Sequence, residues 1–421
     1  MNKLEQLVYG VVSKNPALKQ TVRNLYQGCF DLLPRPKEFF QGDYDFKEGF
    51  YFGFHDVDPI SKDGKMCLAN KLPFDLKMPK PGEGEIVGYF NLDGGKFGDF
   101  HNIGSAYAWN YHKGCRLQWV NDETVIHNTA IENKLRSRTY NVITGEERII
   151  NWPIDAISTD GKFATSFSYE RLERCMPGYG YPYSDPDSYL SEDIPAETGL
   201  FLVDLNKNTR QLLVSLKQLS TFAGSKYEHD YLHFVTHSEF SYDNRYIAFL
   251  YRCIPRFDDY MKRYTLMCVY DRKESKLVLL PTQESGSHFV WNKKNQIIAS
   301  VEIDGNCCHA LYDMNDIDNF KIISGGKLNS DGHQSFINDN MFVTDIYPDR
   351  RRMARIYKAD IINDNVVQLV CVYSPKEFQT KDFKCHIACD LHPRVSRTGD
   401  YLCFDSPRTG KRGLYIMKLN E

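Results

Sequence analysis

Four histidines stand at one recurring position of a repeated sequence unit. They are His237 in HSEFS, His288 in HFVWN, His333 in HQSFI and His392 in HPRVS. Each lies four places before the serine of a polar turn, or before the residue that replaces this serine, and His55 lies two places out of register in the first unit. Imidazoles that converge on one place suit a divalent metal ion, a proton-transfer site or both.

Any one of these histidines, taken alone, is more simply a core side chain bonded to a backbone carbonyl. Four of the 12 histidines of the chain at one structural position favour a shared chemical role. Sequence spacing does not separate metal binding from proton transfer, because ligands on different repeats have no fixed separation.

Arginines and tyrosines gather in the loops that would surround these histidines. The candidates for contact with a ligand are Arg171, Arg174, Tyr179, Tyr181, Arg252, Tyr347, Arg350 and Arg394. Guanidinium forks bind carboxylate or sulfate groups through two hydrogen bonds, and tyrosine faces stack on sugar rings. The combination predicts an anionic, ring-shaped ligand. For any one of these arginines taken alone, the simpler alternative is that its side chain faces solvent at the rim of the site and binds no ligand.

Three aspartates stand close to the recurring histidines in the last two units. Asp345 and Asp405 end matching strand patterns, and Asp390 stands two residues before His392. These carboxylates could orient histidines as hydrogen-bond acceptors, or they could cap turns. The chain has no nucleophile elbow, phosphate-binding loop, H-E-x-x-H motif or dinucleotide fingerprint, so serine hydrolysis, phosphoryl transfer and hydride transfer find no support.

The elements that position these residues form a sevenfold repeat of short β-rich runs joined by polar turns. The first halves of the units cover 58–72, 106–120, 155–169, 238–252, 287–301, 333–347 and 392–406. The second halves cover 85–93, 136–146, 199–213, 265–280, 309–323, 354–370 and 413–421. A small sheet cannot bury both of its faces alone, so repeats of this length predict an all-β, seven-bladed β-propeller around a central channel.

We expect the propeller to span 48–421, preceded by an N-terminal helical extension and linker over 1–47. The last unit ends at its third strand, so the outermost strand of that blade should come from the segment before Phe50 and close the ring. A solenoid would need no such closure. Apolar residues recur at helical spacing over 3–33, which predicts a helix packed across the outside, with a surface- or membrane-associated helix as the alternative.

Composition narrows the partners. The formal net charge is −3, so the chain has no basic field of the kind that binds nucleic acid. No run approaches 18 apolar residues, which argues against a membrane-spanning helix, and the N-terminus lacks the pattern of a signal peptide. The 12 cysteines are scattered and favour buried, reduced thiols. Together these features predict a cytoplasmic protein.

The motifs of the C-terminal third resemble those of a known family. GHQSF, TDIYPD and CDLHPRVSRTGDYLCFDSPRTGKRGLYIM resemble the oligogalacturonate lyase group of seven-bladed propellers and its uncharacterised relatives, most strongly over 236–421. The propeller ulvan lyases are a more distant resemblance. The family resemblance implies a manganese ion that binds the uronate carboxylate, and a histidine with a nearby arginine that removes the proton at C5 of the sugar.

The same resemblance assigns roles to particular residues. It matches His288 and His392 to metal-ligand positions and His237 to the blade that supplies the base, with His333 as a further metal ligand. Asp390 stands where the family has a second histidine before the last-blade one, and Gln334 is the only candidate for the family's glutamine. Mn²⁺ is the ion that the resemblance implies, and Ca²⁺ and Zn²⁺ stay open.

The leading hypothesis is a lyase that cleaves uronate-containing acidic oligosaccharides by β-elimination. His237 would take the proton with Arg252 close by, and Tyr179 or Tyr181 would protonate the leaving oxygen. A metal ion or arginines would stabilise the developing negative charge.

Two alternatives belong to other classes. One is a non-catalytic propeller that binds a glycan or a protein in polysaccharide metabolism, since propellers host many functions. The other is a glycoside hydrolase, which would need paired carboxylates facing the mouth, and Asp345 and Asp405 are the only pair that the sequence offers.

Overall fold

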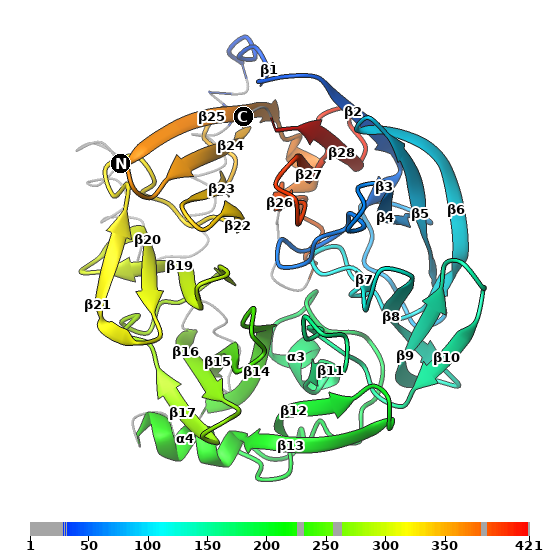
Figure 1. Ribbon diagram of the computed structural model, residues 1–421, viewed down its shortest axis with the longest axis vertical. Coiled ribbons are helices and arrows are strands. Elements are labelled where there is room, and N and C mark those ends of the chain that lie inside the picture. The colour runs from blue at the N-terminus through cyan, green and yellow to red at the C-terminus, as the bar shows by residue number, and fades with distance from the viewer. Residues whose placement is uncertain are drawn as a thin grey trace.

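The computed structural model of the chain is an all-β, seven-bladed β-propeller, as the repeats predict. Seven small antiparallel sheets surround a central channel (Figure 1). The structure describes residues 28, 30, 32–224, 231–255, 263–379 and 385–419. The helix predicted over 3–33 therefore lies almost entirely outside the described residues. The division of the chain at residue 47 stays a prediction.

Each predicted repeat forms one blade. The strands of the first three blades, from the channel outwards, are β3 (Phe50–Tyr51), β4 (Met66–Lys71), β5 (Glu85–Asp93) and β6 (Lys96–Ala106); β7 (Gln118–Trp119), β8 (Thr124–Ile131), β9 (Lys134–Asn141) and β10 (Glu147–Ile150); and β11 (Phe163–Ser166), β12 (Gly199–Asp204) and β13 (Thr209–Ser215). In the third blade a single bridge, between Ile157 and Ala164, takes the innermost place.

The remaining four blades follow the same order. Their strands are β14 (Tyr231–Phe240), β15 (Tyr246–Pro255), β16 (Tyr264–Asp271) and β17 (Lys276–Leu279); β18 (Phe289–Trp291), β19 (Gln296–Ile303), β20 (Asn306–Asp313) and β21 (Asp316–Ile323); β22 (Gln334–Asn338), β23 (Met341–Ile346), β24 (Met353–Asp360) and β25 (Asn365–Tyr373); and β26 (Arg394–Val395), β27 (Tyr401–Ser406) and β28 (Gly413–Lys418). Two helices, α3 (Tyr169–Cys175) and α4 (Leu216–Ala223), and a 3₁₀ turn (Lys376–Phe378) lie between strands.

The N-terminal segment closes the ring. Strand β2 (Tyr44–Glu48) pairs antiparallel with β28, with Tyr44 opposite Met417 and Glu48 opposite Gly413. The closing strand predicted before Phe50 is thus confirmed. Strand β1 (Phe39–Phe40) adds a fifth strand to the outer edge of the sixth blade.

One turn motif recurs between the first and second strands of the blades. In Ser61, Ser158 and Ser241 the hydroxyl donates to the aspartate two residues later at 2.7 Å. The same hydroxyl accepts the backbone N–H five residues later at 2.9 Å in each case. Because the motif fixes the end of the innermost strand, residues counted back from it reach the same height along the channel in different blades.

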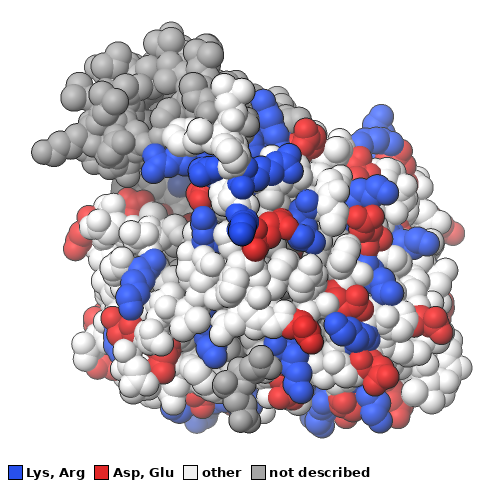
Figure 2. Space-filling view, turned by 90° about the horizontal axis from the view of Figure 1, so that it is seen from above, with Lys and Arg blue, Asp and Glu red and all other residues white. Residues whose placement is uncertain are grey.

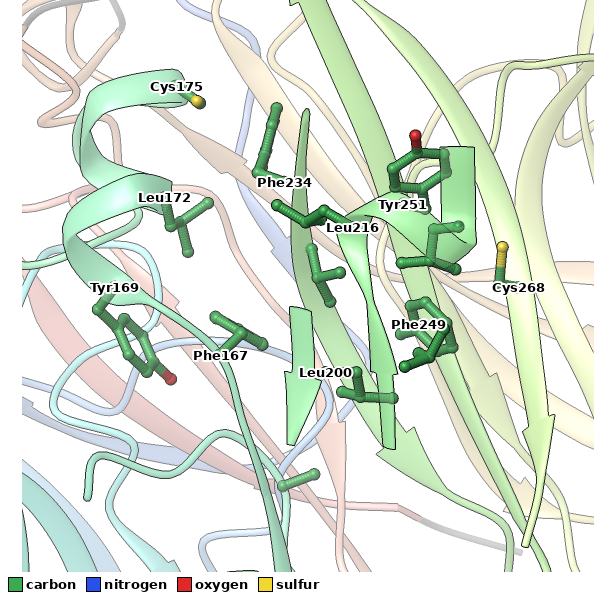
Figure 3. Packing of buried hydrophobic residues seen from close by; sticks show 14 of the residues in the cluster. Phe167, Tyr169, Leu172, Cys175, Leu200, Leu216, Phe234, Phe249, Tyr251 and Cys268 are labelled. Atoms are coloured by element: carbon green, nitrogen blue, oxygen red, sulfur yellow. The ribbon is translucent and has the colours of Figure 1, made fainter. Parts of the chain in front are cut away.

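The long insertion of the third blade packs over its junction with the fourth. Helix α3 begins at Ser168, whose side chain accepts the Arg171 backbone N–H at 3.2 Å. Leu172 of the helix points into a large apolar cluster that also contains Phe234 and Phe249 of the fourth blade (Figure 3). This packing holds the loop after α3 beside the mouth of the channel.

Nine of the 11 described cysteines are buried, and all 11 are free thiols, as the composition predicts. Among the described residues, no helix has the length and apolar character needed to cross a bilayer. Figure 2 shows lysines and arginines interspersed with acidic residues over much of one side of the molecule, in keeping with the near-neutral net charge.

A buried ionic network fastens four blades together under the mouth. Asp155 of the third blade accepts the Ser238 backbone N–H and hydroxyl of the fourth blade at 2.8 and 2.7 Å, and the ammonium of Lys113 from the second. Arg116 donates to the Asp155 carbonyl at 2.7 Å and forks onto Asp56 of the first blade at 2.8 and 3.0 Å. Burial opposes the ionisation of Asp155, but the charges of Lys113 and Arg116 outweigh it and hold the pKa of this carboxyl below its usual range.

Replacing Asp155 should therefore destabilise the whole ring. Asp155→Ala leaves Lys113 and Arg116 buried without their shared acceptor, and we expect a loss of about 3–5 kcal/mol in the free energy of unfolding, measured by urea denaturation. Asp160→Ala, in the exposed turn of the same blade, is the matched control and should cost about 1 kcal/mol. Equal losses in the two variants would contradict a fastening role for Asp155.

Candidate functional site

The recurring histidines meet around one phenylalanine at the centre of the channel mouth. Phe54 is 3% exposed. Its ring centroid lies 4.9, 5.8, 5.7 and 5.1 Å from those of His237, His288, His333 and His392. The structure thus brings together, around Phe54, the four side chains that the repeat places at one position.

Neighbouring imidazoles are close enough to act on one ligand. The ring centroids of His333 lie 4.0 Å from His288 and 4.3 Å from His392, and His237 lies 6.4 Å from His288. His55 packs beneath them, 5.1 Å from His333, with its Nδ1 bonded to the Gln334 carbonyl at 2.7 Å.

Two of the four histidines adopt the left-handed backbone conformation. The φ angles are +50° at His237 and +43° at His392. At His237 the pairing of β14 with β15 shifts register between Thr236 and Ser238, so this histidine is the extra residue of a β-bulge. Such conformations are uncommon for residues other than glycine and cluster where a side chain must be aimed at a site.

Two aspartates orient the middle pair of imidazoles. Asp331 Oδ1 lies 3.1 Å from His288 Nδ1, and Asp345 Oδ1 lies 2.8 Å from His333 Nδ1. Burial opposes protonation of His333, but Asp345 outweighs it and raises the pKa of this imidazole. Burial lowers the pKa of His237, His288, His55 and His392, so these rings are neutral near pH 7.

A cluster suited to a divalent metal ion lies at one side of the mouth. It consists of His112, Asp390 and His392, whose ligand atoms all lie within 4.8 Å of one another. His112 Nδ1 and His392 Nε2 are buried and have no hydrogen-bond partner among the described residues. Burial raises the pKa of Asp390 to about 6. Two orphaned imidazole nitrogens beside a carboxylate are a donor set that Mn²⁺ and Zn²⁺ both accept, so the residues present fit the predicted ion.

This cluster contains two of the five predicted metal ligands. Gln334 directs its amide nitrogen to Ser300 Oγ, His309 Nδ1 and the Gly332 carbonyl at 2.8–3.1 Å, and its Oε1, the atom that would bind a metal ion, is buried without a hydrogen-bond partner among the described residues. His288 and His333 stand beside the cluster, outside it. His112, which the sequence analysis missed, comes from the loop before β7 and stands four residues before Arg116, outside the repeat position.

A pocket of about 190 Å³ opens beside the histidines. Its lining residues are Cys175, Met176, Pro177, Tyr179, His237, Arg252, Ile254, Arg263, Ser287, His288, Asp331, Tyr347 and His386. Four of the predicted site residues, His237, Arg252, Tyr179 and Tyr347, therefore line it together with His288.

The pocket carries uncompensated positive charge. Arg252 is 2% exposed, and its described hydrogen bonds go to the uncharged Thr265 Oγ1 at 3.2 Å and Met176 Sδ at 3.4 Å. Arg263, a second residue that the sequence analysis missed, reaches the same sulfur at 3.8 Å. Burial and then the charge of Arg263 lower the pKa of Arg252 well below its usual range. Two guanidiniums that share a pocket with one carboxylate, that of Asp331, in its described lining are an arrangement that favours an anion.

Tyr179 forms the wall between the pocket and the metal cluster. Its ring stacks on His112 at 4.6 Å and lies 5.9 Å from His237 and 5.2 Å from His386. The loop that carries it approaches His386 so closely that a Cβ at Gly178 would meet the His386 Cβ at 2.6 Å, and Gly178 also has a φ of +87°. Only glycine allows this approach.

The other candidate ligand-binding residues lie outside the pocket lining. Arg171 donates to the carbonyls of His233, Ser188, Tyr189, Glu192 and Asp193, so its guanidinium holds the insertion of the third blade in place. Tyr181 is fully buried and stacks on Tyr169 at 4.4 Å. Arg394 is buried against Asp405 and the Gly53 carbonyl. Arg174 and Arg350 are exposed.

The fold and the mouth define a seven-bladed β-propeller with a histidine-lined site. The chain is similar to an oligogalacturonate lyase from Vibrio parahaemolyticus, with 12% identity and a TM-score of 0.58, covering 92% of this chain and 99% of that one. An oligogalacturonate lyase in complex with manganese gives 13% identity and a TM-score of 0.60 over the same shares. The tricorn protease gives 10% and 0.51, covering 92% of this chain and 34% of that one. No family model and no curated protein matches the sequence. At these identities the similarity establishes the propeller fold.

Metal binding at the cluster can be tested directly. We expect His112→Ala and Asp390→Asn each to weaken Mn²⁺ binding by at least about tenfold, because each removes one of three donors. The measurement is the manganese retained after equilibrium dialysis. His101→Ala is the control, since His101 of β6 is exposed and bonded to Asn91 of β5. Retention of the ion by both cluster variants would contradict this assignment.

Proposed function

We propose that the protein is a lyase that cleaves short, uronate-containing oligosaccharides by β-elimination. The observation that carries the proposal is the pocket, where the neutral imidazole of His237 and the guanidiniums of Arg252 and Arg263 line one space of about 190 Å³. A cavity of roughly 150 Å³ accommodates one benzene ring. The pocket therefore has room for a single six-membered sugar ring beside a base and two cations.

His237 is the proposed base. In β-elimination the base removes the proton on C5 of the uronate, the electron pair forms the C4–C5 double bond, and the bond from C4 to the glycosidic oxygen breaks. The Nδ1 of His237 contacts Thr236 Oγ1 at 2.8 Å, which leaves Nε2 without a partner among the described residues. Burial, together with the charges of Lys113 and Arg252, keeps the ring neutral and ready to accept a proton.

Arg252 and Arg263 bind the uronate carboxylate in this proposal. Their charges make the neighbouring C5 proton more acidic and stabilise the negative charge that develops on the carboxylate as this proton leaves. Contacts with Thr265 and Met176 hold the guanidinium of Arg252 in position, so this side chain needs little rearrangement when the reaction occurs.

Tyr179 is the proposed proton donor to the leaving oxygen. Burial raises the pKa of its phenol well above the ordinary value, so the group carries its proton throughout the neutral range. The ring centroid lies 5.9 Å from that of His237, and both side chains line the pocket, so a sugar ring seated against the two would meet the base and the acid. Tyr347, which is 43% exposed, lines the same pocket and offers a second aromatic face to the sugar.

A divalent ion held by His112, Asp390 and His392 would supply a further positive charge for the uronate carboxylate. We also propose that the reaction takes place in the cytoplasm, which suits a protein whose described cysteines are free thiols. The substrates would then be short acidic oligomers.

A glycoside hydrolase is disfavoured by the placement of its only carboxylate pair. Asp345 and Asp405 are 3% and 2% exposed. Asp345 accepts the backbone N–H groups of His333 and His392, and Asp405 accepts those of Phe52 and Gly53. Neither carboxylate lines the pocket, where a hydrolase would need a pair facing the sugar.

Elimination can be detected by the ultraviolet absorbance of the unsaturated uronate product. Purified protein, with and without Mn²⁺, should generate this product from a panel of uronate oligosaccharides. His237→Ala should lower kcat by about 10²–10⁴-fold, because it removes the base. His127→Ala, at a buried histidine outside the pocket lining, is the control. A flat trace over the whole panel, with intact sugars by mass spectrometry, would indicate a glycan-binding propeller instead.

The pH profile tests the protonation state of the base. The pKa of His237 is lowered below 6.5 by burial and by Lys113, Arg252, His288 and His55. The neutral form therefore persists as the pH falls through 6.5, and kcat/KM should decline only at lower pH. An acidic limb at or above pH 6.5 would mean that His237 is not the base.

A further inference from the structure

A second hollow adjoins the candidate pocket over the fourth and fifth blades. Its volume is about 360 Å³, and its lining comes from β16, β19, β20 and the loops before β18 and β22. Arg263, Ser287 and Asp331 line both spaces. A ring bound in the pocket would therefore have its neighbour in the hollow.

The two spaces differ in the sign of their charge. Among the described lining residues, the pocket has Arg252 and Arg263 against one carboxylate, that of Asp331. The described lining of the hollow has one guanidinium, that of Arg263, against the carboxylates of Asp331 and Glu302. The described lining is thus net positive in the inner space and net negative in the outer space.

A second observation, independent of the charges in the hollow, indicates that the pocket binds an anion. Arg252 is 98% buried, and its described partners, Thr265 Oγ1 and Met176 Sδ, carry no charge. A buried cation is costly unless an anion meets it. The carboxylate of a ligand in the pocket would supply this anion.

We infer that the ligand alternates in charge along its chain, with a uronate in the pocket and a neutral or amino sugar next to it in the hollow. This inference rests on the proposed function for the identity of the first sugar. In a polymer made only of uronates, the second carboxylate would lie against Glu302 and Asp331 in the hollow. Like charges at this range repel each other, and one guanidinium, that of Arg263, faces these two carboxylates in the described lining of the hollow.

Binding measurements test this preference separately from catalysis. Isothermal titration of the His237→Ala variant compares two tetrasaccharides, one that alternates uronate with N-acetylhexosamine and one made only of uronates. The alternating chain should bind at least about threefold more tightly, as the repulsion of one exposed charge predicts. This preference should fall as salt is raised, because salt screens exposed carboxylates.

The variant that addresses the hollow is Glu302→Gln. It removes one exposed carboxylate and should reduce the preference by about two- to fivefold, chiefly through tighter binding of the all-uronate chain. Glu274→Gln is the matched control, because Glu274 is an exposed glutamate in the β16–β17 turn of the neighbouring fourth blade and is not part of the described lining of the hollow. The control should leave the preference unchanged.

The outcomes separate this inference from the proposed reaction. Equal or tighter binding of the all-uronate chain, or a preference that Glu302→Gln leaves intact, overturns the alternating ligand even where the wild-type protein releases unsaturated uronate. A preference for the alternating chain that Glu302→Gln reduces supports it even where no elimination occurs, and the protein is then a binding propeller for such chains.

Discussion

The architecture depends on buried carboxylates that receive the backbone N–H groups around the central channel. The innermost strand of each blade has an open edge, and N–H groups there must find acceptors because they are shielded from water. Asp155 accepts from Ser238, Asp345 from His333 and His392, and Asp405 from Phe52 and Gly53. The contacts with Ser238, His392, Phe52 and Gly53 each join one blade to another, so the groups that satisfy the open edges also hold the ring together.

The same constraint determines where the histidines point. The backbone N–H groups of His333 and His392 both donate to one carboxylate, that of Asp345, and Nδ1 of the His333 ring donates to it as well. Their positions are therefore set by the closure of the sixth blade on the seventh. The fold itself therefore holds the backbone of these histidines in place. Rigid elements of this kind are suited to carry functional side chains.

Features set by local sequence were predictable. The serine turn motif and the alternation of apolar residues depend on neighbours in the chain, and they gave the seven blades, the closing strand and the four converging histidines. His112 was missed because the second blade has Arg116 at the repeat position. Arg116 has a φ of +56°, close to the values at His237 and His392, but its side chain forks onto Asp56.

The arginines show why residue type alone could not identify the pocket. Arg171 and Arg394 carry the same group as Arg252, but Arg171 donates to backbone carbonyls and Arg394 is paired with the Asp405 carboxylate. Arg252 differs only in its surroundings, which are brought together from α3, β15 and β16. The surroundings of an arginine depend on contacts between residues far apart in the sequence, so they cannot be predicted from the spacing of residues along the chain.

Two kinds of side chain at the mouth have different charge states near neutral pH: a neutral histidine and charged arginines. Burial lowers the pKa of His237, so this group is neutral at the pH where a base must accept a proton. Arginines carry a charge that does not titrate in the neutral range. Fixed positive charge from Arg252 and Arg263 favours an anionic ligand, and the charge of Arg252 also helps to keep the adjacent imidazole of His237 unprotonated. Under the proposed reaction, Arg252 thus both binds the carboxylate and maintains the base in its active form.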